Sequence, residues 1–568
     1  MSNNRRRIEE KMNNLYDDPI TSSSYRLEKD KEKLQLRKNK IFNILFSKRK
    51  EVFKNDETNN SIKDIKMIDI NQLKCDEEIK KDVYNYMKTK FKIKNWFKYI
   101  FSSDKNDIQV SLFLIKTHIE LQIYEKNEEE RNLSRNNTDL IKRLCQLLLN
   151  DDIKIMYTAA ICITNLTFFP KNIENRIYSE ENLDTILKFF NIFSNNLTSL
   201  GYKPLFLFLN ISTNMDVKIY LIKHSFLQNL YNLMNDIINN KNNVLDGTLQ
   251  INLIRYCISI LSQLIHVIEI DDNYINGFLP FIPICKLITT NYYVNNDFIM
   301  KEDNYRPNNL ILLWDYYSQD RYNHETIIKE IIKDNFLKVL ILLYYKIKDD
   351  KLKENMIILF SKFLNIGNEI DKILINDGII KFFNDEIDKC QYSKTELVSK
   401  IAFACSNLTY GNIGQIEILF ETGIIFKIID ITSFHIDDNL DNEIKELLIN
   451  CLFFLVNCII PDNQKIKINI LKYKKCIIIN LICKALKREL DPNNRRTLLQ
   501  KMIYAINELN VSSEELEQEM QKEYNMLLLS NSLEELLNIY HDKKYLENSC
   551  KFMIEDIITF IKNLEENI

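Results

Sequence analysis

The sequence predicts an all-α protein that is organised as a solenoid of repeated helical units. Its 568 residues include only eight Gly and eight Pro, whereas Leu, Ile, Lys, Glu and Asn dominate. Strand hairpins depend on turns rich in Gly and Pro, so the scarcity of both favours long runs of helix. A long helical chain with few breakers is often a solenoid, and internal repeats are the test of that interpretation.

An apolar helical run that ends in a polar residue, most often Asn, recurs along the chain. Successive run ends are 42 to 55 residues apart, which fits a three-helix armadillo unit of about 40–47 residues with loop insertions. Such units bury their apolar helices only by stacking on their neighbours, so we expect a right-handed superhelical solenoid of about ten armadillo-like repeats in residues 91–568, with a C-terminal capping repeat. The run ends are Asn165, Asn210, Gln263, Ser318, Asn365, Asn407, Asn457 and Asn507.

A basic arm, residues 1–54, precedes the predicted solenoid, and residues 55–90 are expected to form a linker or leading helix. Residues 26–50 contain ten Lys or Arg and three Asp or Glu, a local charge of +7. Residues 1–25 are neutral and the whole chain carries −3, so residues 51–568 carry −10. This acidic body suits basic peptides and argues against direct nucleic-acid binding, which depends on an excess of positive charge.

Other function classes find little support in the sequence. The apolar window at residues 447–460 is too short to span a bilayer, and the N-terminus lacks a secretory apolar core, so we expect a soluble intracellular protein without membrane contact. The twelve Cys have no metal-binding spacing and are interpreted as reduced packing residues. No catalytic Ser elbow or phosphate-binding Gly loop occurs, so we expect no enzyme activity, no cofactor and no metal.

The basic arm resembles the importin-beta-binding segment of the importin-alpha family, whose pattern reads roughly ELRKxKxxxxxLKRRN. Residues 36–50 align with this pattern without a gap. The body extends the resemblance, since residues 406–431 are similar to the seventh repeat of the family and residues 533–558 to its capping repeat. The resemblance implies that importin-beta is bound by Arg37, Lys38, Lys40, Lys48, Arg49 and Lys50.

In importin-alpha, the third helix of each repeat carries a Trp and, one turn later, an Asn along the cargo groove. The Asn amide offers a donor and an acceptor to the backbone of an extended cargo peptide, and the Trp packs on the aliphatic stem of a cargo Lys or Arg. The resemblance implies that cargo is bound here by Asn165, Phe206, Asn210, Gln263, Trp314, Phe403, Asn407, Phe453 and Asn457.

This chain keeps the Asn positions of the family better than the Trp positions. Only Trp314 keeps the indole, and Asn214 stands where the family has an Asp that pairs with a cargo lysine. An Asn at the end of a helix can also serve only its own turn. We therefore expect cargo binding to shift to the seventh and eighth repeats, and self-inhibition by residues 48–50 to be weak. The Trp positions of four other repeats hold Ile161, Phe206, Phe403 and Phe453.

The function that the resemblance implies is that of a nuclear import adaptor, which shuttles between cytoplasm and nucleus. The arm would recruit importin-beta, the groove would hold cargo proteins with basic localisation signals, and an export receptor would return the adaptor. The alternative is an armadillo-repeat scaffold for protein interactions without import activity, in which the arm is only a localisation signal. Loss of the Trp residues favours the scaffold, whereas the ungapped arm favours the adaptor.

Overall fold

Helices make up all of the regular secondary structure in the part of the chain that the structure describes. The structure is a computed structural model, and the described residues are 96–124, 138–167, 177–239, 245–269, 271–294, 308–318, 324–364, 368–390, 392–409, 413–488, 492–543 and 546–566. The chain forms two compact units, Met1–Leu114 and Ile115–Ile568. The predicted arm and linker, residues 1–90, lie outside the described residues.

The described part of the first unit consists of the 3₁₀ helix η2 (Trp96–Phe101) and the first half of α5 (Lys105–Tyr124). Asp104 starts α5, since its Oδ1 accepts a hydrogen bond of 2.7 Å from the N–H of Asn106. Ser102 Oγ donates to Asp107 Oδ2 at 2.9 Å and closes the same turn. Polar side chains thus satisfy the donors that a helix N-terminus leaves without an intrahelical partner.

The second unit is an array of three-helix repeats, seven of which are complete among the described residues. The first helices are α13 (Met215–Lys223), α16 (Ile275–Phe278), α20 (His324–Ile332), α23 (Asn368–Asn376), α26 (Ile413–Glu421), α29 (Gln464–Lys472) and α32 (Gln518–Ser530). The second helices are α14 (Phe226–Asn239), α17 (Phe281–Ile288), α21 (Phe336–Lys346), α24 (Ile379–Cys390), α27 (Ile424–His435), α30 (Ile477–Lys487) and α33 (Leu533–His541). The third helices are α15 (Gly247–Leu264), α19 (Asn308–Tyr317), α22 (Asp350–Phe363), α25 (Thr395–Leu408), α28 (Asn442–Ile459), α31 (Pro492–Ser512) and α34 (Asn548–Glu566).

Incomplete repeats precede α13, and short helical turns join several of the longer helices. The earlier second helices are α7 (Thr138–Leu147) and α10 (Glu180–Ser194), and the earlier third helices are α8 (Ile153–Thr167) and α12 (Leu205–Ile211). The short elements are α11 (Leu197–Leu200), η4 (Ile265–Glu269), η5 (Asp272–Tyr274), the π-helical turn η6 (Thr289–Val294), η7 (Lys333–Asn335) and η8 (Ser513–Glu515).

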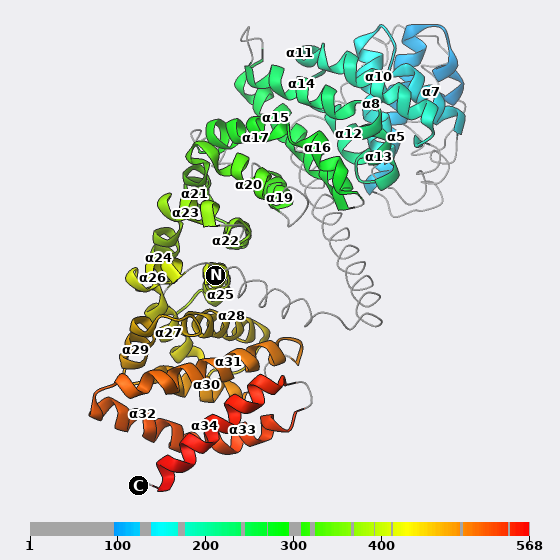
Figure 1. Ribbon diagram of the computed structural model, residues 1–568. Coiled ribbons are helices and arrows are strands. Elements are labelled where there is room, and N and C mark those ends of the chain that lie inside the picture. The colour runs from blue at the N-terminus through cyan, green and yellow to red at the C-terminus, as the bar shows by residue number, and fades with distance from the viewer. Residues whose placement is uncertain are drawn as a thin grey trace. The chain divides into compact units, whose positions relative to one another are not determined.

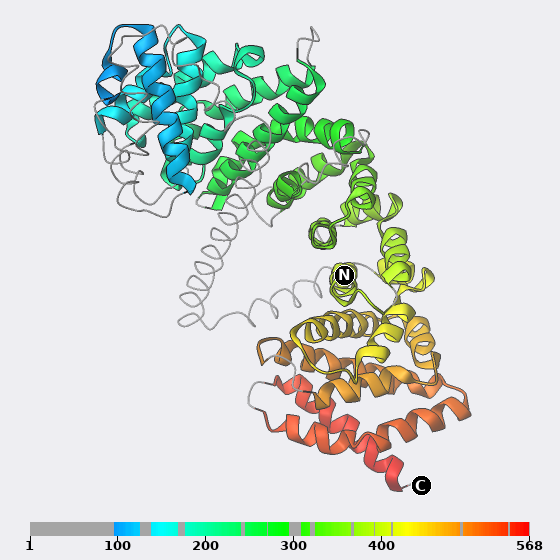
Figure 2. The same ribbon diagram turned by 180° about the vertical axis from the view of Figure 1, so that it is seen from behind.

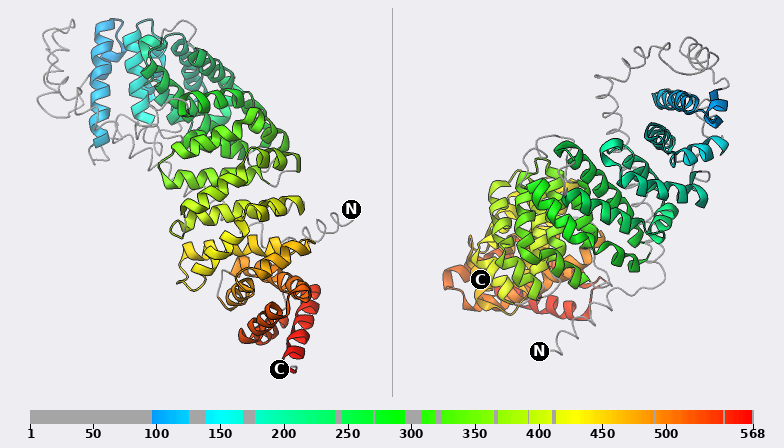
Figure 3. Two further views of the ribbon diagram at one scale, coloured as in Figure 1. Left: turned by 90° about the vertical axis from the view of Figure 1, so that its left-hand side faces the viewer. Right: turned by 90° about the horizontal axis from the view of Figure 1, so that it is seen from above.

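The third helices form one layer in which each helix packs on the next in chain order. Contacts run from α8 to α12 and α15, then through α19, α22, α25 and α28 to α31 and α34 (Figures 1 and 2). Figure 3 shows the same succession from the side. We call these nine helices the third-helix layer. The stacking of three-helix units confirms the predicted all-α, armadillo-like solenoid, because each unit buries its apolar helices against its neighbours.

Acidic and amide side chains mark the starts of many of these helices. Asp246, Asp349 and Asp441 cap the third helices α15, α22 and α28, each by accepting a hydrogen bond from the backbone N–H three residues later. Asn214 and Asn463 cap α13 and α29 in the same way. Part of the Asn-rich composition therefore serves helix capping, which Asn and Asp perform better than apolar residues.

A residue in the left-handed conformation stands between the first and second helices of six repeats. Its positive φ lets the chain reverse sharply, and only glycine adopts this conformation at no steric cost. Glycine occupies the position before α24 and before α27, with φ of 95° and 77°. The six residues are Ser225, Asn335, Gly378, Gly423, Cys476 and Ser532.

The described cysteines are core residues. All eleven are buried and unbridged, and burial raises the pKa of the Cys451 thiol to about 12 and that of Cys390 to about 11. Their thiols therefore stay protonated near neutral pH and pack as small apolar groups. This agrees with the interpretation of the sequence; Cys75 lies outside the described residues.

One described segment, Gly247–Ile268, is long and apolar enough to span a membrane, and the bent pair α12 and α13 would qualify if taken as one span. The segment joins α15 to η4, and 78% of its most apolar window is buried inside the fold. Its neighbours α12 and α19 cover α15 on either side. The composition of this segment is that of a helix in the middle of the solenoid core.

Candidate functional site

Asn210, at the end of α12, ties two neighbouring third helices together. Its Nδ2 donates to the carbonyl of Thr164 at 2.9 Å and to Thr167 Oγ1 at 3.0 Å, both at the end of α8. The side chain is buried, with 4% of the residue exposed. Both amide hydrogens are thus used inside the protein, which leaves Asn210 without a donor for a partner peptide.

Asn407, at the end of α25, makes the same backward contact but stays half-buried. Its Nδ2 donates to the carbonyl of Ser361 in α22 at 2.9 Å. The contact uses one of the two amide hydrogens. Within the described residues, Asn407 Oδ1 has no hydrogen-bond partner, so this amide retains one donor and one acceptor.

The backward contacts correct the predicted repeat register at α22. Asn210 bonds Thr164, which directly precedes Asn165 in α8. Asn407 bonds Ser361 in the same way, so the residue that follows Ser361, namely Lys362, is the counterpart of Asn165 in α22. Lys362 in turn forms an ion pair with Asp315 in α19. Ser318 is buried and its Oγ donates to the carbonyl of Trp314 on its own helix, while Asn365 lies outside the described residues.

Trp314 is a core residue. None of its surface is exposed, and its ring lies 5.2 Å from the ring of Phe336 and 6.0 Å from that of Tyr317, centroid to centroid. A side chain that is fully covered has no face to offer to a peptide. The prediction that Trp314 lines a cargo groove is wrong, because the indole is buried against Phe336 at the start of the second helix α21.

The N-terminal Asn and Phe positions are also largely committed to packing. Asn165 is buried, with 5% exposed. Phe206 is half-buried in an aromatic group, 4.5 Å from the ring of Tyr256 and 6.4 Å from that of Tyr202. Gln263 is half-buried on α15. The expected shift of cargo binding toward the seventh and eighth repeats stays a prediction.

Phe403 is the predicted site residue that the structure leaves most open. It lies one turn before Asn407 on α25, and 44% of its surface is exposed. The third helix α28 packs along α25 and places Phe453 and Asn457 next in line. We call Phe403, Asn407, Phe453 and Asn457 the candidate peptide site.

Lys501, which the sequence analysis did not single out, contacts the second half of the candidate peptide site. Its Nζ donates to Asn457 Oδ1 at 2.6 Å and lies 5.6 Å from the centroid of the Phe453 ring. Lys501 comes from α31, one repeat later. No sequence signal predicts this contact, because a lysine on a helix face normally points into solvent.

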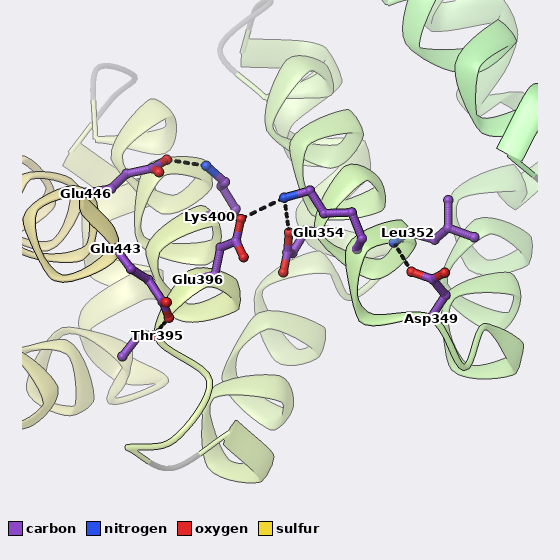
Figure 4. Close-up of polar contacts among 9 residues, drawn as sticks. Asp349, Leu352, Glu354, Thr395, Glu396, Lys400, Glu443 and Glu446 are labelled. Carbon is purple, nitrogen blue, oxygen red and sulfur yellow. Dashed lines mark hydrogen bonds and ion pairs between the residues drawn. The ribbon is translucent and has the colours of Figure 1, made fainter. Parts of the chain in front are cut away.

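A row of ion pairs crosses the starts of α22, α25 and α28, beside the candidate peptide site (Figure 4). Lys351 Nζ bridges Glu354 on its own helix and Glu396 on α25, at 2.7 Å each. Lys400 of α25 pairs with Glu446 of α28. These contacts neutralise most of the charge locally and join three repeats side by side.

The two carboxylates that share Lys351 respond to it in opposite directions. Hydrogen bonding from Lys351 holds the pKa of Glu396 below its ordinary value. Burial raises the pKa of Glu354 and outweighs the hydrogen bond that it also receives from Lys351. The stabilising carboxylate of this group is therefore the more exposed one, Glu396.

The importin-beta-binding residues Arg37, Lys38, Lys40, Lys48, Arg49 and Lys50 lie outside the described residues. In the described part of the chain, no group of three or more His, Cys, Asp or Glu side chains is placed to hold a metal ion.

Comparison with known proteins shows the fold. Neither a protein-family model nor a curated protein matches the chain. Among solved structures, an engineered protein from the Northeast Structural Genomics Consortium matches 82% of this chain and 98% of its own, with a TM-score of 0.59 and 10% identity. The two chains share an α-solenoid fold.

Two further solved structures have lower TM-scores. A designed armadillo repeat protein in complex with the peptide (KR)4 matches 46% of this chain and 98% of its own, with a TM-score of 0.34 and 14% identity. A chain from a study of a phosphorylation switch that controls the interaction between cadherin and beta-catenin matches 87% of this chain and 100% of its own, with a TM-score of 0.48 and 11% identity.

The two backward-bonded Asn residues should differ in what they contribute to stability. Asn210→Ala removes two buried hydrogen bonds across the repeat boundary, and we expect it to lower the free energy of unfolding by about 1–3 kcal/mol. Asn407→Ala affects a half-buried bond, and we expect a loss below about 1 kcal/mol. Urea titration followed by circular dichroism measures both. Equal losses would contradict the assignment of Asn407 to a binding role.

The ion pair of Glu396 should make part of the stability depend on pH. Because its pKa is lowered in the folded protein, its contribution is present above the ordinary value of 4.5 and is lost as the pH falls through the folded pKa. We expect Glu396→Gln to cost ~0.2–1 kcal/mol at pH 7 and to cost progressively less as the pH falls below 4.5. Thermal unfolding across pH measures this, with exposed Glu519→Gln as control. A cost that stays constant with pH would contradict the assignment.

Proposed function

We propose that this protein is an armadillo-repeat scaffold that binds an extended peptide segment of a partner protein at the candidate peptide site. The observation that carries the proposal is the combination of an exposed Phe403 ring with an amide, Asn407, that keeps one donor and one acceptor for a ligand. Asn165 is buried, and Asn210 is buried with both amide hydrogens bonded inside the protein. The site therefore lies where α25 and α28 adjoin.

The chemistry of this site suits an extended backbone. Asn407 Oδ1 accepts a peptide N–H and its remaining Nδ2 hydrogen is donated to a peptide carbonyl, which fixes the register of the segment for any side chains. Phe403 provides apolar area for one side chain or its aliphatic stem. Backbone recognition combined with one aromatic contact gives modest affinity that a longer segment increases.

Charge supports a partner with a net positive charge. Residues 51–568 carry −10, and an acidic surface raises the local concentration and the association rate of basic segments. The ion pairs around Lys351 and Lys400 leave little net charge at the site itself. Electrostatic attraction of the partner would thus act at long range. At the site itself, the shape of the surface and the Asn407 amide would decide which segment binds.

A second candidate function is nuclear import, favoured by the arm. Residues 36–50 match the importin-beta-binding pattern without a gap, so this function would have the arm recruit importin-beta while the candidate peptide site holds cargo with a basic localisation signal. The protein would then shuttle between cytoplasm and nucleus with the help of an export receptor. The buried Trp314 and the internal bonds of Asn210 weigh against high affinity for such signals.

Substitutions in the candidate peptide site should weaken peptide binding without unfolding the protein. We expect Phe403→Ala and Asn407→Ala each to raise the Kd of a bound peptide by about 5- to 100-fold, since loss of a hydrogen bond or an apolar contact costs about 1–3 kcal/mol. The probe is a fluorescein-labelled peptide from an interacting protein identified by crosslinking, titrated by anisotropy. Exposed Phe434→Ala is the matched control. Unchanged Kd values for both site variants would refute the proposal.

The arm should bind importin-beta through its basic residues. We expect the double substitution Arg37→Glu and Lys38→Glu to weaken binding at least tenfold, because each charge-assisted bond contributes roughly 1.5–3 kcal/mol. Pull-down and titration of purified importin-beta measure this, with Arg5→Glu and Arg6→Glu as the control pair of equal charge change. Equal weakening by the two pairs would leave only nonspecific attraction, and no binding at all would favour the scaffold.

A further inference from the structure

Lys501 occupies the part of the candidate peptide site where a ligand cation would be placed. Its ammonium group donates to Asn457 Oδ1 at 2.6 Å and lies 5.6 Å from the centroid of the Phe453 ring. An amide oxygen together with the face of an aromatic ring is a suitable environment for a lysine or arginine side chain. The chain therefore supplies its own cation to this place.

The same amide has a second, unused group. Asn457 is 6% exposed, and its Nδ2 is buried with no hydrogen-bond partner among the described residues. A buried amide that lacks a partner costs about 1–3 kcal/mol, and proteins rarely retain one without a reason. Asn457 thus has its acceptor satisfied by Lys501 and its donor available for a carbonyl oxygen.

In the part of the chain that the structure describes, no Lys or Arg bonds Asn407 or lies over the Phe403 ring in the neighbouring half of the site. Lys501 follows Asn457 by 44 residues, and the residue 44 positions after Asn407 is Cys451, which is fully buried in α28. Phe403 stays 44% exposed, whereas Phe453 is half-buried. A lysine of the chain therefore covers the pair Phe453 and Asn457, whereas the pair Phe403 and Asn407 stays uncovered.

We propose that Lys501 is a specificity-determining residue, which bars lysine and arginine from the place formed by Phe453 and Asn457. This inference rests on the proposed peptide-binding function and refines it. A basic side chain of the partner has to displace Lys501 or lie beside it. Two positively charged side chains that lie side by side repel each other strongly. A neutral side chain meets no such barrier, and the spare Asn457 Nδ2 binds the backbone carbonyl of the segment.

The two halves of the candidate peptide site therefore prefer different side chains along one bound peptide. The Phe403 and Asn407 half accepts a basic or neutral side chain, whereas the Phe453 and Asn457 half selects a neutral one. Discrimination of this kind comes from a repulsive element and needs no new attractive contact. A partner that binds here would carry its positive charge toward one end of the bound segment.

The test compares Lys501→Met with the exposed Lys472→Met as a matched control, in the full chain. Methionine keeps the aliphatic length of Lys501 and removes the charge. The probes are fluorescein-labelled (KR)4 and a peptide of equal length in which Gln replaces every basic residue. We expect Lys501→Met to tighten (KR)4 binding roughly tenfold, to leave the Gln peptide within about twofold, and Lys472→Met to change neither. Should Lys501→Met lower the unfolding temperature, Lys501→Gln serves as the second variant.

The outcomes separate this inference from the proposed function. A tenfold gain that is specific to the basic peptide supports the role of Lys501. Equal gains for both peptides, or none in either Lys501 variant, overturn it. The proposed function fails by a different result, namely peptide binding that is insensitive to Phe403→Ala and Asn407→Ala in the wild-type background.

Discussion

The packing of each third helix on the third helices at its two sides is the constraint on which the rest of this structure depends. Within its own repeat, a third helix such as α25 or α28 packs on the second helix, and the rest of its apolar surface is buried against the neighbouring repeats. The helices must therefore be apolar on two sides, which explains why a segment such as Gly247–Ile268 is apolar enough to resemble a membrane span. The polar ends of the same helices then have to find partners across the repeat boundary.

Those partners explain why the same amide position serves two purposes. At Asn210 the backward bond is buried and complete, so the side chain acts only in assembly. At Asn407 an identical bond leaves one donor and one acceptor, because the residue is half-buried. Between Asn210 and Asn407, the number of amide hydrogens that are bonded inside the protein decides whether the side chain serves assembly alone or also keeps a group for a ligand.

The helical class and the repeat could be predicted from the sequence, because scarce Gly and Pro and a recurring apolar run with a polar end depend only on local chemistry. Asn165, Asn210, Asn407 and Asn457 all fall at the ends of third helices, as their position in the runs indicates. The overlap of α22 with its neighbours could not be predicted, since it depends on which residues meet across a repeat boundary. The prediction failed at Trp314, where an expected surface residue is fully buried, and it missed Lys501, whose partner lies 44 residues away.

The left-handed residues between first and second helices have a consequence for where a binding surface is easiest to maintain. Outside glycine, this backbone conformation stores roughly 1–2 kcal/mol of steric strain, somewhat less for Asn. Ser225, Cys476 and Ser532 impose that strain on their repeats, whereas Gly378 and Gly423 relieve it in the repeats that contain α25 and α28. The two repeats that present Phe403 and Phe453 therefore have relaxed corners. These two repeats therefore tolerate the destabilising effect of an exposed aromatic ring and of an unpaired buried amide better than a strained repeat does.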